Sequence, residues 1–308
     1  MYTWRMRRVF MNMKIFVIFL LTFPHVSRSV NLGNACQNMW NNAGNNLDIP
    51  TELTVNAVNN ANPLFTVVQG GGGVAKLASN VFTRFEDILV DYQAVPFVLN
   101  QQHVNDFITA VTQPGGPMEA ALNYLLGQPG SLPQGVTTLE QFRCVIEKLW
   151  FRNSNGFKHV FVGNQMPNNN NYNGFHNWYQ FLLEQRRNPA RTTHIAFNQP
   201  AFVGNTLPKF LRRLSFRWRG ATKVPLGSSS SMFVGTSPAF DLAMFTACVL
   251  RGRAPGGGAI QWNGKRKTDC ECNIHVPAGG LQQSLVEFRT VENPQNGWVV
   301  TAYPRNVQ

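Results

Sequence analysis

The chain has 308 residues, of which 44% are hydrophobic, 12% aromatic and 14% charged. This composition supplies enough apolar side chains for a sizeable core, and it excludes a chain that is disordered throughout. The formal net charge of +12 favours acidic partners, such as nucleic acid or an anionic surface, without choosing between them.

The first 29 residues have the pattern of a signal peptide. Basic residues precede the apolar run IFVIFLLTF (15–23), and the small residues Ser27 and Ser29 follow it where a signal peptidase would cleave. The run is too short for a membrane-spanning helix, which needs about 20 residues. A buried strand or a short membrane anchor are the alternatives. We expect a secreted protein without a membrane anchor, with residues 1–29 removed and a mature chain that begins near Val30.

The cysteines predict disulfides in a secreted chain. Five of them allow up to two disulfides and leave one odd thiol. Cys270 and Cys272 form a C-x-C pair, but no second cysteine pair stands at the spacing of a zinc site. We therefore expect a strand at this pair, with a disulfide partner elsewhere. The five positions are Cys36, Cys144, Cys248, Cys270 and Cys272.

The chain from 30 to about 150 carries mostly helical patterns. A weak one surrounds CQNMW (36–40), and apolar residues recur at helical spacing between Asn80 and Thr112. The segments MEAALNYLL (118–126) and LEQFRCVIEKLWF (139–151) predict two further amphipathic helices. Between these patterns, QGGGGV (69–74) is expected to be a flexible loop, since no GK[ST] follows that would make it a phosphate-binding loop.

After Phe151 the patterns change to short strands. HVFVG (159–163), MFVG (232–235), CNIHV (272–276) and WVVTAY (298–303) predict strands, and HNWYQFLLEQRR predicts a helix that begins at or just after His176. In the first strand His159 and Phe161 would face one way, and Val160 and Val162 the other. The predicted fold class is α+β, with a helical portion (about 30–150) before a mixed half with antiparallel sheets (about 151–308) in one domain, 30–308.

A basic stretch runs from Lys209 to Lys223. It contains six basic residues and no acid, interleaved with Phe210, Phe216 and Trp218. Positive charge and aromatic rings together suit single-stranded RNA, which offers phosphates and unstacked bases. Such a run is also common on a solvated face, so it supports an RNA partner without establishing one.

Several segments resemble the poly(U)-specific endoribonuclease family, EndoU or XendoU. The similarity covers about 33–304, and it is carried by GFKHVFVG, GFHNWYQFLLEQ, MFVGTSPAFDLAMFTAC and the terminal WVVTAYP. It implies a two-lobed α+β unit that cleaves single-stranded RNA, preferably at uridines, as a monomer with no DNA partner. By resemblance, the catalytic residues are His159, His176 and Lys223, and the substrate-binding residues are Ser228, Thr301 and Tyr303.

The implied reaction uses the 2′-hydroxyl of the RNA itself and leaves 2′,3′-cyclic phosphate and 5′-hydroxyl ends. It needs a base for the 2′-hydroxyl proton and an acid for the leaving oxygen, and histidine suits both roles near neutral pH. The resemblance implies His176 as the base and His159 as the acid, with the reverse assignment open. Lys223 would face the charge that develops on the phosphorus centre.

Two departures from the family pattern affect a metal and a pKa. Glutamates associated with Mn²⁺ dependence in some members are replaced by Lys158 and Asn164, so a Mn²⁺ cofactor is implied by the resemblance and put in question by the residues. An ammonium beside an imidazole disfavours its protonation, so we expect Lys158 to lower the pKa of His159. The segment PNNNNYN (167–173), between the histidines, is expected to be a surface loop.

The sequence leaves one main alternative to an enzyme. A catalytically inactive relative that binds RNA or a surface glycan would keep the fold, and the loss of both glutamates favours it. Retention of His159, His176, Lys223 and Tyr303 together favours the enzyme. A secreted zinc hydrolase is a weaker third possibility, because no HExxH motif or carboxylate cluster accompanies the histidines.

Overall fold

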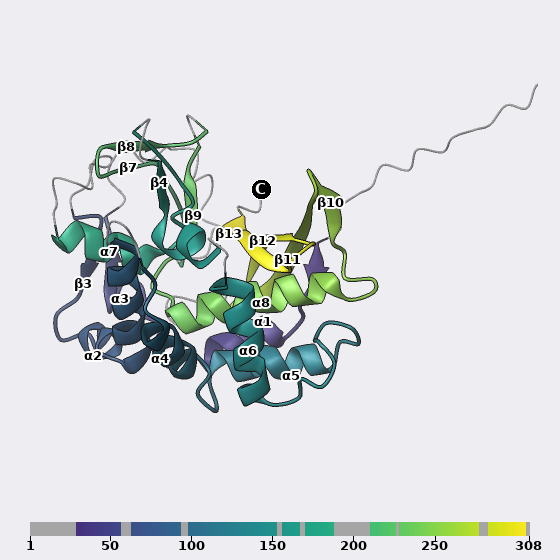
Figure 1. The fold of residues 1–308 in the computed structure, drawn as a ribbon. Helices are drawn as coiled ribbons and strands as arrows, with labels where there is room; N and C mark the ends of the chain where they lie inside the picture. Colours follow the sequence, from purple (N-terminus) through teal and green to yellow (C-terminus); the bar gives the residue numbers. More distant parts are fainter. Residues whose placement is uncertain are drawn as a thin grey trace, which may run out of the picture.

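The structure is a computed structural model that describes residues 29–56, 63–93, 98–152, 156–166, 170–187, 210–225, 228–276 and 283–305. Within these ranges helices dominate before residue 151 and strands dominate after 163, so the predicted α+β class is confirmed (Figure 1). The predicted signal peptide, except for Ser29, lies outside the described residues, as does Lys209. Among the described helices, none combines the length and the apolar character that crossing a membrane requires.

The helical patterns of the first half are confirmed. Capping explains several boundaries: Thr138 Oγ1 accepts a hydrogen bond from Gln141 N at 3.3 Å, and Gln141 Oε1 accepts one from Thr138 N at 3.1 Å. The segment QGGGGV (69–74), expected to be a loop, is one only as far as residue 72, because a short helix begins at Gly73. The helices are α1 (Ala35–Asn41), α2 (Gly73–Leu77), α3 (Asn80–Gln93), α4 (Gln101–Val111), α5 (Pro117–Leu126) and α6 (Leu139–Trp150).

A five-stranded sheet forms one wall of the molecule, on the right in Figure 1. Its order is β1-β11-β12-β13, and β10 pairs with residues 265–267 at the start of β11. All pairs are antiparallel except β1 with β11. The strands at CNIHV and WVVTAY are therefore confirmed. The strands are β1 (Val30–Asn31), β10 (Ile260–Trp262), β11 (Lys265–His275), β12 (Gln283–Asn293) and β13 (Trp298–Arg305).

One face of this sheet is buried against α8 (Pro238–Arg253) and α1. Alternate residues of β11, among them Cys270 and Cys272, point into that core. Disulfides join Cys36 to Cys272 and Cys248 to Cys270, and Cys144 on α6 is an exposed free thiol. The prediction of two disulfides with C-x-C on a strand, and one odd thiol, is confirmed.

The other sheets are built from short strands. Four of these strands form a sheet in the order β4-β5-β8-β7, on the left in Figure 1, and β6 pairs with β9. The predicted strand at MFVG and the helix after His176 are both present. The elements are β2 (Leu53–Val55), β3 (Phe65–Val67), β4 (Asn164–Met166), β5 (Asn171–Asn173), α7 (Trp178–Arg187), β6 (Leu211–Leu214), β7 (Arg217–Trp218), β8 (Ala221–Lys223) and β9 (Ser230–Phe233).

The segment HVFVG is not a strand, and that prediction was wrong. It forms a π-helical turn, η1 (Lys158–Val162), closed by a 2.7 Å hydrogen bond from Gly163 N to Lys158 O. Val160, Phe161 and Val162 are all buried, so the alternation of faces predicted for a strand does not occur. Tertiary packing is the cause. Three consecutive apolar side chains are all enclosed by the core, so buried and exposed residues do not alternate as they would in a half-exposed strand.

The asparagine-rich segment is a loop only in part. Residues 167–169 lie outside the described residues, but 171–173 form β5, whose Asn171 and Tyr172 pair in parallel with Thr222 and Lys223. Tyr172 is fully buried and donates a hydrogen bond to Phe216 O at 2.9 Å. The expected surface loop is therefore wrong for these residues, and the segment instead positions the strand that carries Lys223.

The basic stretch does not present its aromatic rings. Phe210, Phe216 and Trp218 are each less than 5% exposed and belong to the core. Arg219 is paired with the buried carboxylate of Glu184 at 2.7 Å, while Arg213 and Arg217 are exposed. The prediction that these rings alternate with basic charge on an RNA-binding surface is wrong, because the rings were required to fill the core between α7 and the short strands.

Candidate active site

The two histidines are joined through their backbones. Phe175 N donates to His159 O at 2.8 Å, and His176 N donates to Val160 O at 2.6 Å. The imidazole centroids lie 6.2 Å apart. Gly174 permits this contact, because its φ is +70° and a Cβ there would overlap the carbonyl oxygen of His159. The glycine before Phe175 is therefore required by the approach of the two segments.

His176 is fixed by one hydrogen bond and one ring contact. Its Nδ1 lies 2.9 Å from Ser231 O, and since a carbonyl only accepts, the proton is on Nδ1 and Nε2 keeps its lone pair. The ring stacks on Tyr303 with centroids 5.2 Å apart. Burial, with smaller effects of Lys223 and His159, holds the pKa of His176 well below 6.5. The imidazole is thus neutral and has a free basic nitrogen.

The helix that follows His176 begins at a capped residue. Asn177 Oδ1 accepts a hydrogen bond from Gln180 N at 2.9 Å, which fixes the first turn of α7. The amide group of Asn177 also donates to Asp241 Oδ2 at 3.3 Å. Asp241, on α8, is 1% exposed, and its burial raises the pKa of its carboxyl to about 8. The segment after His176 is therefore anchored to α8 by a carboxyl group that is largely protonated at neutral pH.

His159 lies on η1 and is partly buried. Burial is the largest cause that lowers the pKa of its imidazole to about 4, followed by the charges of Lys223 and Lys265. The expected lowering is therefore confirmed, but the charges that cause it are those of Lys223 and Lys265, and its attribution to Lys158 was wrong. Asn164 Nδ2 lies 3.3 Å from Nδ1 of His159, so a donated hydrogen bond leaves Nε2 to carry the ring proton.

Lys223 is held between the histidine segments. It is 7% exposed, and its ammonium donates a hydrogen bond to Gly174 O and lies 5.4 Å from the centroid of the Tyr172 ring. Burial lowers the pKa of Lys223 to about 7. Ser230 Oγ donates to the same carbonyl at 3.2 Å. The glycine that lets the histidines meet therefore also anchors the lysine.

The remaining predicted residues occupy different positions. Tyr303 on β13 contacts His176, and Thr301 lies two residues earlier on the same strand. The hydroxyl groups of Thr301 and Ser228 are both buried without a hydrogen-bond partner among the described residues. Ser228 N donates to Pro225 O at 2.9 Å, and its role in substrate binding stays a prediction.

Sequence reasoning missed two serines of the same run. Ser231 accepts from His176 through its carbonyl, and its hydroxyl donates to Pro304 O, while Ser230 donates to Gly174. The run of four serines (228–231) was recognised in the sequence, but identical residues do not show which of them lies next to the histidines. The pairing of β6 with β9 decides which serine faces the histidines.

The donor set does not fit a metal ion beside His159. The two positions of the family glutamates hold an ammonium and an amide, Lys158 and Asn164. Across the described residues, no group of three or more His, Cys, Asp or Glu side chains is arranged to hold a metal. Both the proposed Mn²⁺ and the zinc-hydrolase alternative lack ligands in these parts of the chain, and no step below uses a metal.

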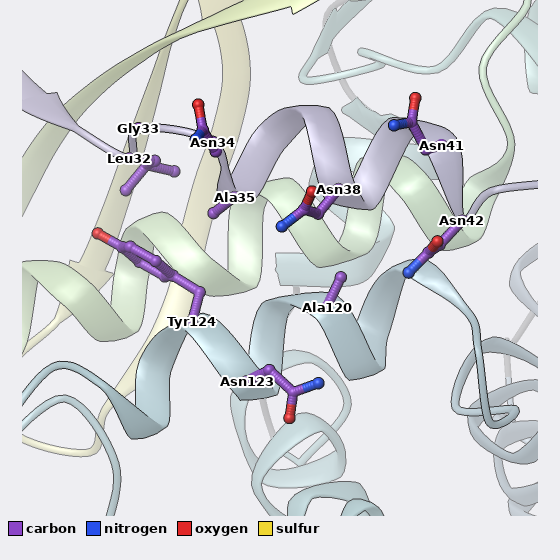
Figure 2. A pocket seen from close by; sticks show the side chains of 10 residues that line it. All are labelled: Leu32, Gly33, Asn34, Ala35, Asn38, Asn41, Asn42, Ala120, Asn123 and Tyr124. Carbon is purple, nitrogen blue, oxygen red and sulfur yellow. The ribbon is translucent and has the colours of Figure 1, made fainter.

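A groove of about 610 Å³ lies away from the histidines, between α1 and α5 (Figure 2). Asparagine amides do not titrate near neutral pH, and no histidine or carboxylate lines this groove, so it lacks an acid and base pair. None of the predicted site residues lines it. The lining residues are Leu32, Gly33, Asn34, Ala35, Asn38, Asn41, Asn42, Ala120, Asn123 and Tyr124.

The fold and the histidine pair are those of an α+β protein with a two-histidine site, and comparison with known families shows to which family the chain belongs. The family model Endoribonuclease XendoU matches residues 31–276, so this chain belongs to the XendoU family. The match ends before Thr301 and Tyr303, whose roles therefore rest on the motif and, for Tyr303, on the contact with His176.

Curated relatives and a solved structure are consistent with this membership. Uridylate-specific endoribonuclease C of Danio rerio is 30% identical over 218 residues, which are 64% of this chain and 64% of that protein. Poly(U)-specific endoribonuclease-A of Xenopus laevis is 29% identical over 205 residues, or 61% and 65% of the two chains. The chain thus spans slightly less than two thirds of the length of these relatives.

The solved structure is that of XendoU, described as a splicing-independent snoRNA-processing endoribonuclease. It is 21% identical and covers 90% of this chain and 97% of its own, with a TM-score of 0.64. At this identity the likeness establishes the shared fold.

Proposed function

We propose that this protein is a secreted endoribonuclease that cleaves single-stranded RNA, preferably at uridines, by transesterification. The observation that carries the proposal is that backbone hydrogen bonds join the two segments that carry the histidines. The ammonium of Lys223 is bound to the carbonyl of Gly174 at the same place. Membership of the XendoU family, whose relatives are named for uridylate or poly(U) specificity, supports RNA as the substrate.

His176 is suited to the role of base. Because its Nδ1 donates to Ser231 O, its Nε2 can take the proton from the 2′-hydroxyl. The 2′-oxygen then forms a bond to phosphorus, and the bond from phosphorus to the 5′-oxygen breaks. The products are a 2′,3′-cyclic phosphate and a 5′-hydroxyl.

His159 is suited to the role of acid. To act as the acid the ring must first become the imidazolium; its Nδ1–H then donates to the Oδ1 of a turned Asn164 amide, and Nε2 passes its proton to the leaving 5′-oxygen. The pKa of about 4 belongs to the protein without RNA, and the negative charge of a bound phosphate raises it. Each positioned proton transfer is worth about 10²- to 10⁴-fold in rate.

Lys223 supplies the positive charge that the transition state requires. Its ammonium is buried, so its effect on the phosphorus centre is stronger than it would be in water. Since burial lowers its pKa to about 7, half of the lysine is neutral at that pH in the protein without RNA. We expect kcat/KM to fall above pH 7, and the fall to move to higher pH in Lys223→Arg, whose guanidinium stays charged.

Substrate contacts and secretion rest on separate observations. Tyr303 packs on His176, and the hydroxyls of Thr301 and Ser228, which are buried without a partner among the described residues, would have to become exposed to pair with a ribose or a uracil edge. A buried polar group left unpaired is costly, which favours substrates that satisfy it. The signal-peptide pattern of residues 1–29 and the two disulfides support secretion.

The test is a cleavage assay of the mature chain on a short uridine-containing single strand, with and without Mn²⁺. Mass spectrometry identifies the ends. We expect cyclic phosphate ends without added metal, their loss in His159→Ala and Lys223→Ala, and their retention in Lys148→Ala, which removes an exposed lysine of α6. No cleavage under either condition, with salt-dependent RNA binding retained, would establish the inactive binding protein instead.

A further inference from the structure

The face of the five-stranded sheet that carries Thr301 continues onto the β10–β11 hairpin. Residues directly opposite each other on paired strands share a face. Thr301 is paired with Val291, Val291 with Lys267, and Lys267 with Ile260. This row crosses four strands, from the predicted substrate residue to the outermost strand of the sheet.

The end of the hairpin adds an exposed aromatic ring to the same face. Trp262 is paired with Lys265, two residues along from the pair of Ile260 and Lys267. The turn between them is Asn263-Gly264, with φ of +48° and +71°, the left-handed conformations of a tight hairpin turn. Trp262 is 49% exposed, in contrast to the buried rings of Phe216 and Trp218 in the basic stretch.

Lys265 and Lys267 place two positive charges near this ring, and the charge of Lys267 also helps to lower the pKa of Asp269. Among the described residues, no carboxylate lies within 4.0 Å of the ammonium of Lys265 or of Lys267. Arg266 points to the opposite face and is paired with Glu292 at 2.5 Å. Further along this face, Asp269 is neutralised by Arg289 and Arg305, and Glu271 lies beyond it on β11.

The hairpin is close enough to the histidines to share a substrate with them. Three strand spacings of about 4.8 Å separate β13 from β10, so the row spans about 14 Å. The charge of Lys265 also reaches the imidazole of His159, whose pKa it lowers. A single strand bound at Thr301 and Tyr303 can therefore extend across the sheet to Trp262.

We propose that the β10–β11 hairpin is a second RNA subsite, at which Trp262 stacks on a base beyond the cleaved nucleotide and Lys265 and Lys267 contact the flanking phosphates. This proposal rests on the proposed function, and it adds that the enzyme binds a longer RNA strand more tightly than a dinucleotide. Stacking on an aromatic ring accepts any base, so this subsite adds affinity without adding sequence preference.

The test compares substrates of two lengths. Trp262→Ala is expected to raise the Kd of a decanucleotide whose 2′-hydroxyls are methylated about 5- to 100-fold, measured by fluorescence anisotropy. The kcat/KM for cleavage of the dinucleotide UpU is expected to stay unchanged. Trp262→Phe should restore most of the affinity, and Lys267→Gln should weaken binding and reduce its salt dependence. Lys148→Gln removes a lysine from the helical side and is the matched control.

The outcomes separate the two proposals. Equal decanucleotide affinity for wild type and Trp262→Ala would overturn the subsite, as would equal losses in Lys267→Gln and Lys148→Gln. A wild-type chain that cleaves neither UpU nor the same decanucleotide with free 2′-hydroxyls would overturn the proposed function alone. In that case the decanucleotide affinities still decide whether the hairpin binds RNA.

Discussion

The five-stranded sheet and the histidine region differ in how they handle ionisable groups. On the sheet, Asp269 accepts hydrogen bonds from Arg289 at 2.6 and 2.9 Å. Burial alone would raise the pKa of Asp269, but Arg289 and Arg305 lower it. Around the histidines, the buried Lys223 and the partly buried His159 have no carboxylate within 4.0 Å in the part of the chain that the structure describes, and burial lowers the pKa of both. Buried charges are thus satisfied where the fold is being stabilised and left without counter-charges where an anion is expected.

The same two regions differ in backbone regularity. β11 and β12 have 11 residues each and pair over most of their length, and both disulfides end on β11. The histidine region uses strands of two to four residues, a π-helical turn and left-handed conformations at Gly174 and Phe175. β13 contacts both η1 and β9, so the regular sheet supports the irregular site. Residues in uncommon conformations persist only where surrounding structure holds them.

Removal of the Cys36–Cys272 disulfide should give the largest loss of stability among these predictions, because this bond ties α1 to the five-stranded sheet. The Cys36–Cys272 bond closes 236 residues and the Cys248–Cys270 bond 22. Loop-closure entropy predicts a loss of about 5 kcal/mol for Cys36→Ala/Cys272→Ala and about 3 kcal/mol for Cys248→Ala/Cys270→Ala. Urea unfolding of the oxidised variants measures both. Equal losses would show that the size of the closed loop does not govern this sheet.

Gly174→Ala should be the most damaging single change in the histidine region. The added methyl group would overlap His159 O at a φ of +70°, so we expect a loss of about 3 kcal/mol and of RNA cleavage. Gly220→Ala is the matched control, since its φ is +81° but nothing lies within 4 Å of the new Cβ. It should cost about 1 kcal/mol in urea unfolding. A similar loss in both variants would show that backbone conformation, and not contact with His159, determines the cost.

Asp241→Asn should stabilise the protein, and only at higher pH. Burial raises the pKa of this carboxyl from its ordinary value of 3.8 to about 8 in the folded state, so it contributes its stability below pH 3.8 and loses it as the pH rises through 8. Asparagine stays neutral and can still accept from Asn177. We expect a gain on the order of 2 kcal/mol at pH 8 and none at pH 4, from thermal or urea unfolding. A gain that does not change with pH would contradict a raised pKa.

The smallest predicted effect concerns which lysine acts on His159. Lys265→Gln should raise the pKa of this imidazole from about 4, because it removes one of the two charges that lower it. Lys158→Gln should leave the pKa nearly unchanged, since burial, Lys223 and Lys265 account for the lowering. NMR titration of the imidazole carbons measures both. The opposite ranking would restore the explanation drawn from the sequence, in which Lys158 is the neighbouring charge.

The long periodic patterns were readable from the sequence because local physics decides them. The helices at 80–111, 117–126 and 139–150, and the strands around CNIHV and WVVTAY, each have a solvent-facing side that gives burial a clear period. The cysteine spacing likewise predicted two disulfides, a strand at C-x-C and an odd thiol, and these are confirmed. The motifs also indicated the family, to which the chain belongs.

The sequence by itself therefore determined the fold class, the family and the residues to consider as catalytic. Only the tertiary structure decided how His159, His176 and Lys223 meet, because the contact is made by backbone groups of segments that each lack a long periodic pattern. It also decided that Phe216 and Trp218 are core and Trp262 is exposed. An aromatic residue has the same apolar surface in either place, and whether that surface is covered depends on neighbours that are distant in the chain.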